Sequence, residues 1–289
     1  MNKVWGKFKN FFKYNSVAVV YLLLFVLSQT IIGFGVLFHK IMNDFEFGDK
    51  FLEVLMPYYD NPNNMVALEQ YPNFYIDYME LLSELLIPII LLSNLAIVFI
   101  IGIKILITRK NENLFKKISI SNICKYLFLG ILLNIVISFI VSLLPMELIE
   151  DHASNTEALL VGNPIILFLS AGVLAPLAEE LIFRYGMLKN LIKINPIFAI
   201  IYQALLFGLL HGNIVQSSYA FVLGLIFGII VYKKGNVLLT ILMHIGINAS
   251  SVLTVILGMN EMLCLALIMI VMFILFLIFN KIEKNKGDL

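Results

Sequence analysis

Residues 178–184 read Ala178-Glu179-Glu180-Leu181-Ile182-Phe183-Arg184. This stretch places two adjacent carboxylates and a guanidinium in a segment that is otherwise apolar enough to lie in lipid. A charged side chain at the centre of a bilayer costs roughly 3 to 15 kcal/mol. Charges at that depth indicate either ion partners or a function, and for intramembrane acids a function is the default expectation.

The composition of the whole chain is that of a membrane protein. Of its 289 residues, 61% are hydrophobic and 13% are charged, and the mean hydropathy is +0.95. A soluble domain is about half apolar and a quarter charged, so we expect an all-α fold, a polytopic transmembrane helical bundle. Cys124 and Cys264 both lie in apolar segments, which argues against a disulfide framework. The net charge of +1 gives no indication of nucleic-acid binding, and no nucleic-acid partner is expected.

Segment length predicts about eight transmembrane helices, at ~20 residues per span. The expected spans are 16–38, 82–107, 122–145, 163–188, 196–213, 217–232, 236–258 and 260–280. The fifth and sixth are short and adjacent, so a tight hairpin or a partly re-entrant pair is the alternative, with seven spans in total. The first span is too long for a cleaved signal peptide and is expected to remain in the protein.

The basic residues predict the orientation of the bundle. Eighteen of the 20 Lys and Arg residues fall on one side of the expected spans, and Lys40 and Lys50 fall on the other. By the positive-inside rule, both termini are cytoplasmic. The segments 40–81 and 147–162 are then external acidic loops. The Asn-, Ile- and Lys-rich composition indicates a bacterial cytoplasmic membrane.

The residues around Arg184 divide the two acids between two roles. Glu180 and Arg184 are four residues apart, share a helical face and stand in the favourable order for an ion pair. Glu179 points about 100° away and has no partner in its own helix, so it is the free carboxylate. The structural alternative is a simple ion cluster without chemistry.

Three further polar residues are expected near Glu179. His211 ends the fifth span, and His244 and Asn248 share one face of the seventh. Taken singly, each could be a packing or interhelical hydrogen-bonding residue. At ~1.5 Å per residue, all four groups lie roughly 12 to 22 Å from the cytoplasmic side. This shared depth favours one hydrolytic site, in which Glu179 takes a proton from water and His211 helps to hold that water. His244 and Asn248 would donate to the oxyanion.

In order along the chain, Glu179-Glu180-x-x-x-Arg184, Phe207-x-x-x-His211 and His244-x-x-x-Asn248 resemble the three motifs of the CPBP intramembrane proteases. This family comprises type II CAAX prenyl endopeptidases and bacteriocin-processing or immunity (Abi) proteins. The resemblance implies a helical membrane endopeptidase with Glu179 as base and His211 as its partner. His244 and Asn248 would bind the oxyanion, while Glu180, Arg184 and Phe207 would support the site.

The resemblance also divides the single membrane domain 1–289. Residues 163–258 form the expected catalytic core, preceded by variable helices at 1–162, with the loop 40–81, and followed by a last helix and cytoplasmic tail at 259–289. Membrane lipid and a peptide or membrane-protein substrate are the expected partners. A prenylated substrate is disfavoured, because bacteria mostly lack prenylated CAAX proteins.

Three alternatives to a metal-free protease stay open. Glu179, His211 and His244 could supply the Glu and two His of a zinc site, although a metal-free reaction is favoured. The chain could be a non-proteolytic immunity or regulatory protein that keeps the motifs. A proton-coupled transporter is the third reading, and the absence of repeated halves disfavours it.

Overall fold

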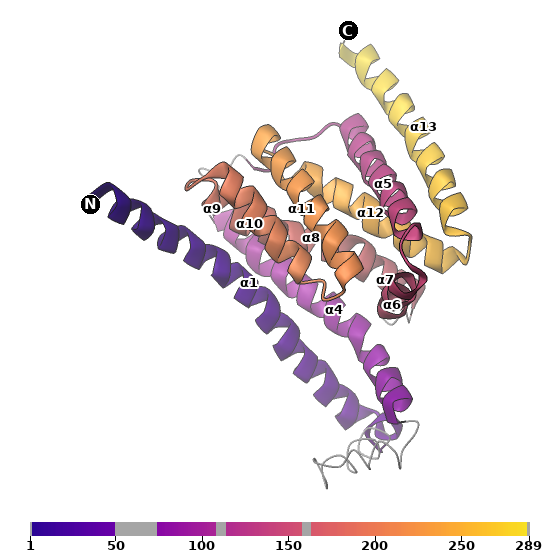
Figure 1. The fold of residues 1–289 in the computed structure, drawn as a ribbon. Coiled ribbons are helices and arrows are strands. Elements are labelled where there is room, and N and C mark those ends of the chain that lie inside the picture. The colour runs from indigo at the N-terminus through magenta and orange to yellow at the C-terminus, as the bar shows by residue number, and fades with distance from the viewer. Residues whose placement is uncertain (1, 50–73, 108–113, 158–162, 288–289) are drawn as a thin grey trace.

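The computed structural model describes residues 2–49, 74–107, 114–157 and 163–287, and within these ranges the fold is helical without a strand (Figure 1). The all-α prediction is confirmed. The helices are α1 (Asn2–Asn43), α4 (Phe74–Ile107), α5 (Ile120–Ser142), α6 (Met146–Glu157), α10 (Pro196–Leu209), α11 (Ile214–Lys234), α12 (Leu238–Leu257) and α13 (Glu261–Gly287). Between α6 and α10 runs one continuous helix, made of α7 (Pro164–Leu167), η2 (Phe168–Leu174), α8 (Ala175–Glu180), η3 (Leu181–Leu188) and α9 (Lys189–Leu191).

Seven helices of the described part of the chain are long and apolar enough to cross a membrane. The expected fifth span, 196–213, is the exception. Its helix α10 has 14 residues, or about 21 Å at 1.5 Å per residue, which is short of the ~30 Å hydrocarbon core. Gly212, with a φ of 71°, turns the chain before α11 begins. The described part of the chain therefore has seven helices of spanning length and one shorter apolar helix, α10. Helix α10 forms a hairpin with the spanning helix α11.

Three asparagines define where the helices around the site begin. The side chains of Asn163, Asn195 and Asn213 each accept hydrogen bonds from backbone N–H groups in the first turn of α7, α10 and α11. Asparagine is among the best N-cap residues because its side chain satisfies donors that the helix leaves unpaired. Pro164 and Pro196 follow two of these caps, where a missing N–H costs nothing.

The predicted external loops are more helical than expected. Residues 146–157 form α6, because leucine and isoleucine among the acids let this segment fold as a short amphipathic helix. In 40–81, α1 continues to Asn43, residues 45–49 are helical and α4 begins at Phe74. Residues 50–73, including the predicted turn at 56–64, lie outside the described residues.

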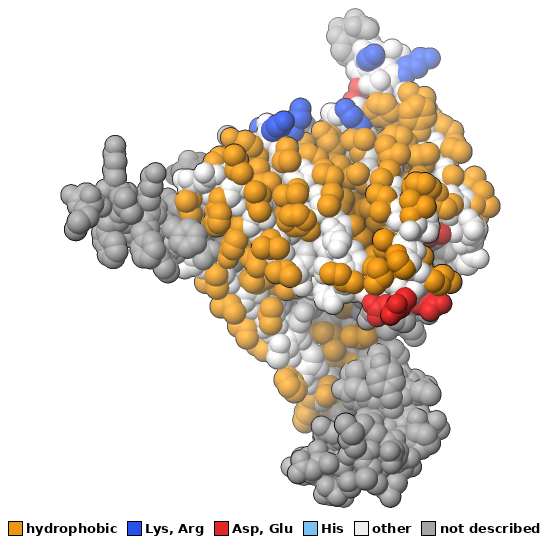
Figure 2. Space-filling model, viewed as in Figure 1, with side chains coloured by type: hydrophobic (Ala, Val, Ile, Leu, Met, Phe, Trp, Pro, Cys, Tyr) orange, Lys and Arg blue, Asp and Glu red, His pale blue; other side chains and the backbone are white. Residues whose placement is uncertain are grey.

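Helix α12 is the centre of the bundle. It contacts α5, η2, α8, α11 and α13, and 56% of its span is buried, against 6% for α1. Figure 2 shows a broad hydrophobic surface with Lys and Arg gathered at one edge and most acidic side chains near the opposite edge. This distribution agrees with a bundle whose apolar belt lies in the bilayer.

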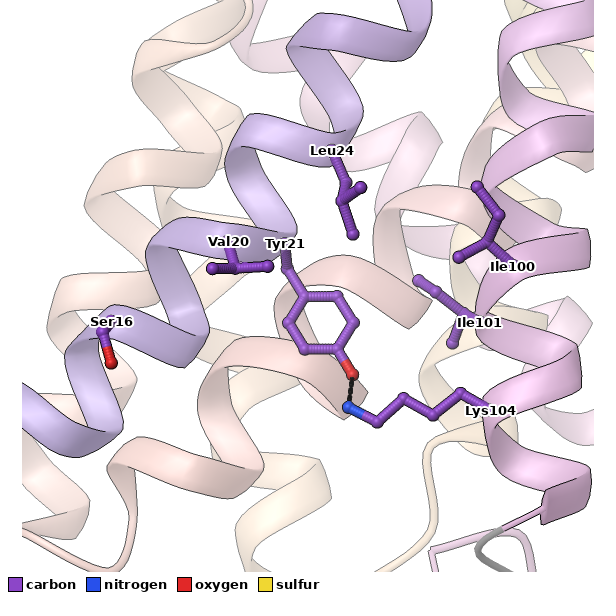
Figure 3. Close-up of a pocket in the computed structure, with 7 residues that line it drawn as sticks. All are labelled: Ser16, Val20, Tyr21, Leu24, Ile100, Ile101 and Lys104. Carbon is purple, nitrogen blue, oxygen red and sulfur yellow. Dashed lines mark hydrogen bonds between the residues drawn. The ribbon is translucent and has the colours of Figure 1, made fainter.

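Helices α1 and α4 run side by side along the flank of the bundle (Figure 1). Between them lies an open, mainly apolar groove of about 340 Å³. At one end of this groove the Lys104 ammonium on α4 donates a hydrogen bond to the Tyr21 hydroxyl on α1 (Figure 3). The Tyr21 ring also packs on Gly186 of η3, where an added Cβ would lie 2.7 Å from the ring. Tyr21 thus joins the flanking pair to the core helix.

Candidate active site

The helix that carries the two glutamates is irregular on both sides of them. Segments η2 and η3 are π-helical, and α8, which holds Glu179 and Glu180, is a six-residue α-helical piece between them. π-Helical turns are rare and occur frequently at functional sites. Because each wider turn rotates the residues beyond it, the side chains here do not follow a simple period of 3.6.

Glu180 and Arg184 form the predicted ion pair. Arg184 Nε lies 3.2 Å from Glu180 Oε2, and both side chains are completely buried. The guanidinium nitrogens Nη1 and Nη2 have no hydrogen-bond partner among the described residues. A buried charge without compensation is expensive, so the surroundings of Arg184 must supply further stabilisation.

Aromatic rings supply it. The Arg184 Cζ atom lies 4.5 Å from the centroid of Phe207, 5.3 Å from that of Phe227 and 5.9 Å from that of Phe183. The electron-rich face of an aromatic ring attracts a cation, and the attraction is stronger where water is excluded. The three rings form an aromatic cage, defined here as Phe183, Phe207 and Phe227, around the one guanidinium.

His244 lies between the two glutamates. Its Nδ1 is 3.1 Å from Glu180 Oε1, and its Nε2 is 3.7 Å from Glu179 Oε2. The imidazole is nearly buried, with 5% of its side chain exposed, whereas 20% of the Glu179 side chain is exposed. The predicted division of the two acids is confirmed in this respect: Glu180 is enclosed with Arg184, and Glu179 faces a different group.

His211 does not pair with Glu179. Its Nδ1 lies 2.8 Å from the backbone oxygen of Phe207, and its ring meets the Phe207 ring edge-on at 5.0 Å. Phe207 also meets the His244 ring edge-on, at 5.8 Å. The two histidines therefore contact the same phenylalanine, and no hydrogen bond or ion pair between His211 and Glu179 occurs in the described structure.

Asn248 lies one turn beyond His244 on α12. Its Nδ2 donates to the Ala171 oxygen of η2 at 3.3 Å, and the side chain is partly exposed. An asparagine amide carries two N–H donors, so this contact leaves one donor for another acceptor. Helix α12 therefore contacts the helix Pro164–Leu191 at two points one turn apart, through His244 to α8 and through Asn248 to η2.

The zinc-ligand set is not assembled in this arrangement. Among the residues that the structure describes, no three His, Cys, Asp or Glu side chains are grouped so that they could hold a metal ion. His211 binds the Phe207 carbonyl, while His244 faces Glu179 and Glu180. The residues present do not fit a site made of Glu179, His211 and His244.

Two residues of this centre escaped the sequence reasoning. Phe227 contacts both Arg184 and His244, whose ring centroid lies 5.7 Å from its own. Gln203 is fully buried and donates from Nε2 to the Gly224 oxygen at 2.7 Å. A polar Gln203 one turn before Phe207, opposite the pair Gly224 and Gly228, was the available signal, but small-residue spacing by itself predicts only close packing.

Comparison with known proteins finds a family model that matches part of the chain. Residues 161–250 match the family model of type II CAAX prenyl endopeptidase Rce1-like proteins. A search of curated proteins and a search of solved structures find no match. The matched segment contains every residue of the centre described above and leaves out α1, α4, α5 and α13. This segment of the chain is therefore similar to type II CAAX prenyl endopeptidases, and the described part of the chain has seven helices long and apolar enough to cross a membrane.

Proposed function

We propose that this protein is an intramembrane endopeptidase in which Glu179 activates water for attack on a peptide bond. One observation carries the proposal: His244 Nε2 and Glu179 Oε2 face each other at 3.7 Å. This separation is longer than a direct hydrogen bond, and a water to one side of the line that joins the two atoms can contact both.

The position of the His244 ring between the two acids suits such a water. If the Nδ1–H group donates to Glu180, the neutral imidazole presents a lone pair on Nε2. Nε2 and the Glu179 carboxylate are then two acceptors that face each other, and a water can donate one hydrogen to each. Its oxygen lone pairs point away from both, towards an incoming carbonyl carbon. His244 thus takes the water-holding role that the sequence led us to expect of His211.

The reaction then balances with the chain's own groups. Glu179 accepts a proton from the water, and the hydroxide forms a bond to the carbonyl carbon of the substrate. The remaining N–H of Asn248 is available to the resulting oxyanion. When the C–N bond breaks, Glu179 returns the proton to the leaving amine. His211, whose Nδ1 is engaged with Phe207, offers Nε2 as an acceptor for a substrate N–H group.

The setting we propose is the bacterial cytoplasmic membrane, with both termini cytoplasmic. The Lys and Arg edge in Figure 2 supports this orientation through the positive-inside rule. The proposed substrate is a peptide or membrane-anchored protein whose scissile bond reaches the depth of Glu179. The proposed reaction uses no metal ion.

The test is turnover of quenched-fluorescent peptides, or of a co-expressed candidate precursor, by the purified full chain in liposomes. Wild type is compared with Glu179→Gln and His244→Gln, each with and without a zinc chelator. Glu147→Gln, an exposed acid on α6, is the matched control. We expect turnover by wild type and the control, loss of at least about a hundredfold in both site variants, and no effect of the chelator.

Other outcomes overturn parts of the proposal. Loss with chelator that added zinc restores would overturn the metal-free reaction. Turnover by Glu179→Gln at the wild-type rate would remove the assigned base. No turnover by wild type, together with unimpaired biological activity of Glu179→Gln, would show a non-proteolytic immunity or regulatory protein.

A further inference from the structure

The hairpin α10–α11 contributes two rings to the candidate active site. Phe207 of α10 and Phe227 of α11 each contact the Arg184 guanidinium and the His244 imidazole. Phe227 is completely buried, and its centroid lies 5.7 Å from that of His244. The Phe227 ring therefore contacts both side chains that bind the Glu180 carboxylate, Arg184 and His244.

The register of this hairpin is set one turn away from the rings. Gln203 Nε2 donates to the Gly224 oxygen on α11 at 2.7 Å and to the Ile200 oxygen on its own helix at 3.0 Å. A Cβ added at Gly224 would lie 2.8 Å from the Ala204 Cα atom. The two helices are thus as close as a glycine permits, and one buried side chain joins them at a single register.

This register determines where Phe227 lies. Gly224 and Phe227 are three residues apart on one helix, as Gln203 and Phe207 are four apart on the other, and residues at these spacings share a face. Fixing Gln203 against Gly224 therefore directs both phenylalanines at Arg184. Since Nη1 and Nη2 of Arg184 have no hydrogen-bond partner among the described residues, the rings are the visible stabilisation of that side of the guanidinium.

We propose that Phe227 is a positioning residue for the reaction, an inference that rests on the proposed function. It holds Arg184 against Glu180 and limits rotation of the His244 ring, so that Nδ1 faces Glu180 and Nε2 faces Glu179. The Phe227 ring is completely buried behind these two side chains, so it acts through them and not on the substrate. Without the ring, Arg184 and His244 gain freedom, and the two acceptors around the proposed water lose their alignment.

The experiment replaces the ring in two ways. Phe227→Leu removes it and keeps an apolar side chain. Substitution of Phe227 by mono-, di- and trifluorinated phenylalanine keeps its shape and withdraws electron density from its face. Phe47 is the matched control, because it is also a buried ring under a cation, Lys40 at 5.3 Å, but packs in a separate cluster with Leu85. Folded fractions are measured by size-exclusion chromatography and used to normalise kcat.

The expected result is a fall in kcat of about tenfold or more for Phe227→Leu, the scale of one desolvated cation–π contact. Log kcat should fall stepwise with fluorination at Phe227, while KM changes less than twofold. The Phe47 series should leave kcat unchanged. An unaltered kcat in all Phe227 variants, with wild type active and Glu179→Gln inactive, would overturn this inference and leave the proposed function standing.

A second readout does not need turnover. The chain has four histidines, so ¹⁵N imidazole shifts can be assigned to His244 by comparison with His244→Gln. We expect one dominant Nδ1–H tautomer in wild type and averaged or shifted signals in Phe227→Leu. If wild type proves inactive on every peptide, the proposed function fails, and unchanged His244 signals in Phe227→Leu would overturn the positioning role as well.

Discussion

Two cation–aromatic contacts of almost equal length lie in different regions of this molecule. On the flank, Lys104 Nζ is 4.6 Å from the Tyr21 ring centroid, and in the core, Arg184 Cζ is 4.5 Å from that of Phe207. Lys104 is exposed, whereas Arg184 is completely buried. Such contacts contribute about 0.5–1 kcal/mol at exposed sites and about 2 kcal/mol or more when desolvated. At equal distance, the environment of the cation therefore decides how much such a contact contributes to stability.

The same difference separates the helices that carry these contacts. Helix α1 buries 6% of its span and meets α4 across an apolar groove, whereas the continuous helix Pro164–Leu191, which carries Arg184, buries 44% of its span. The buried polar groups of the core include Glu180, Arg184, Gln203, Thr240 and His244. The flank is therefore expected to tolerate changes of charge that the core does not. Four variants test this contrast, from the largest expected effect to the smallest.

Arg184→Gln should destabilise the protein most. Removing one member of a buried ion pair leaves the other charge uncompensated, at a cost of about 3–5 kcal/mol. Unfolding in detergent, followed by circular dichroism, measures the loss. The double variant with Glu180→Gln should recover much of the stability, because a neutral pair needs no counter-charge, yet it should stay inactive. An Arg184→Gln protein within about 1 kcal/mol of wild type would contradict the assigned burial of this pair.

Glu179→Gln should affect turnover rather than folding. The carboxylate is 20% exposed, and the close ion pair of Arg184 is with Glu180, so the amide is expected to change the free energy of unfolding by less than about 1 kcal/mol. Loss of the general base lowers kcat by roughly 10²–10⁴-fold. Steady-state kinetics and unfolding curves are taken on the same preparation. A loss of stability comparable to that of Arg184→Gln would show that the two acids are not divided as described.

Gly186→Ala should have an intermediate effect at the junction of flank and core. The new Cβ would lie 2.7–2.9 Å from three atoms of the Tyr21 ring, and overpacking of this kind costs about 1–3 kcal/mol. Gly35→Ala on α1, where nothing lies within 4 Å, is the control and should be neutral or slightly stabilising. Adding Tyr21→Leu to Gly186→Ala should recover part of the loss, and no recovery would place the clash elsewhere.

Lys104→Gln should have the smallest effect. The hydrogen bond and ring contact join the exposed Lys104 side chain to the buried Tyr21, and because the cation itself is exposed, the loss in unfolding free energy should not exceed about 1 kcal/mol. Lys125→Gln, an exposed lysine on α5, serves as control. A loss as large as that of Arg184→Gln would mean that the flank is energetically part of the core.

The helical membrane fold and the Glu180–Arg184 ion pair can be predicted from local patterns in the sequence. Apolar runs of spanning length predict the helical membrane fold, and the spacing of Glu180 and Arg184 predicts their ion pair, because residues four apart meet on a helix whatever surrounds it. The order of the three motifs predicts the resemblance to CAAX proteases, and residues 161–250 match the model of that family. The expected fifth span, 196–213, was wrong in length, because the Asn195 cap and the turn at Gly212 shorten α10.

The contacts between side chains of different helices depend on helix rotation and register, and only the tertiary structure shows them. The amino-acid sequence by itself determined that charged groups are buried in an apolar bundle, since hydropathy and spacing are local properties. Only the fold decided that His244 lies between both glutamates, that Phe207 separates it from His211 and that Phe227 completes the aromatic cage. The physical reason is that π-helical turns and glycine contacts shift side chains by part of a turn, which decides interhelical contacts and leaves the hydrophobic pattern unchanged.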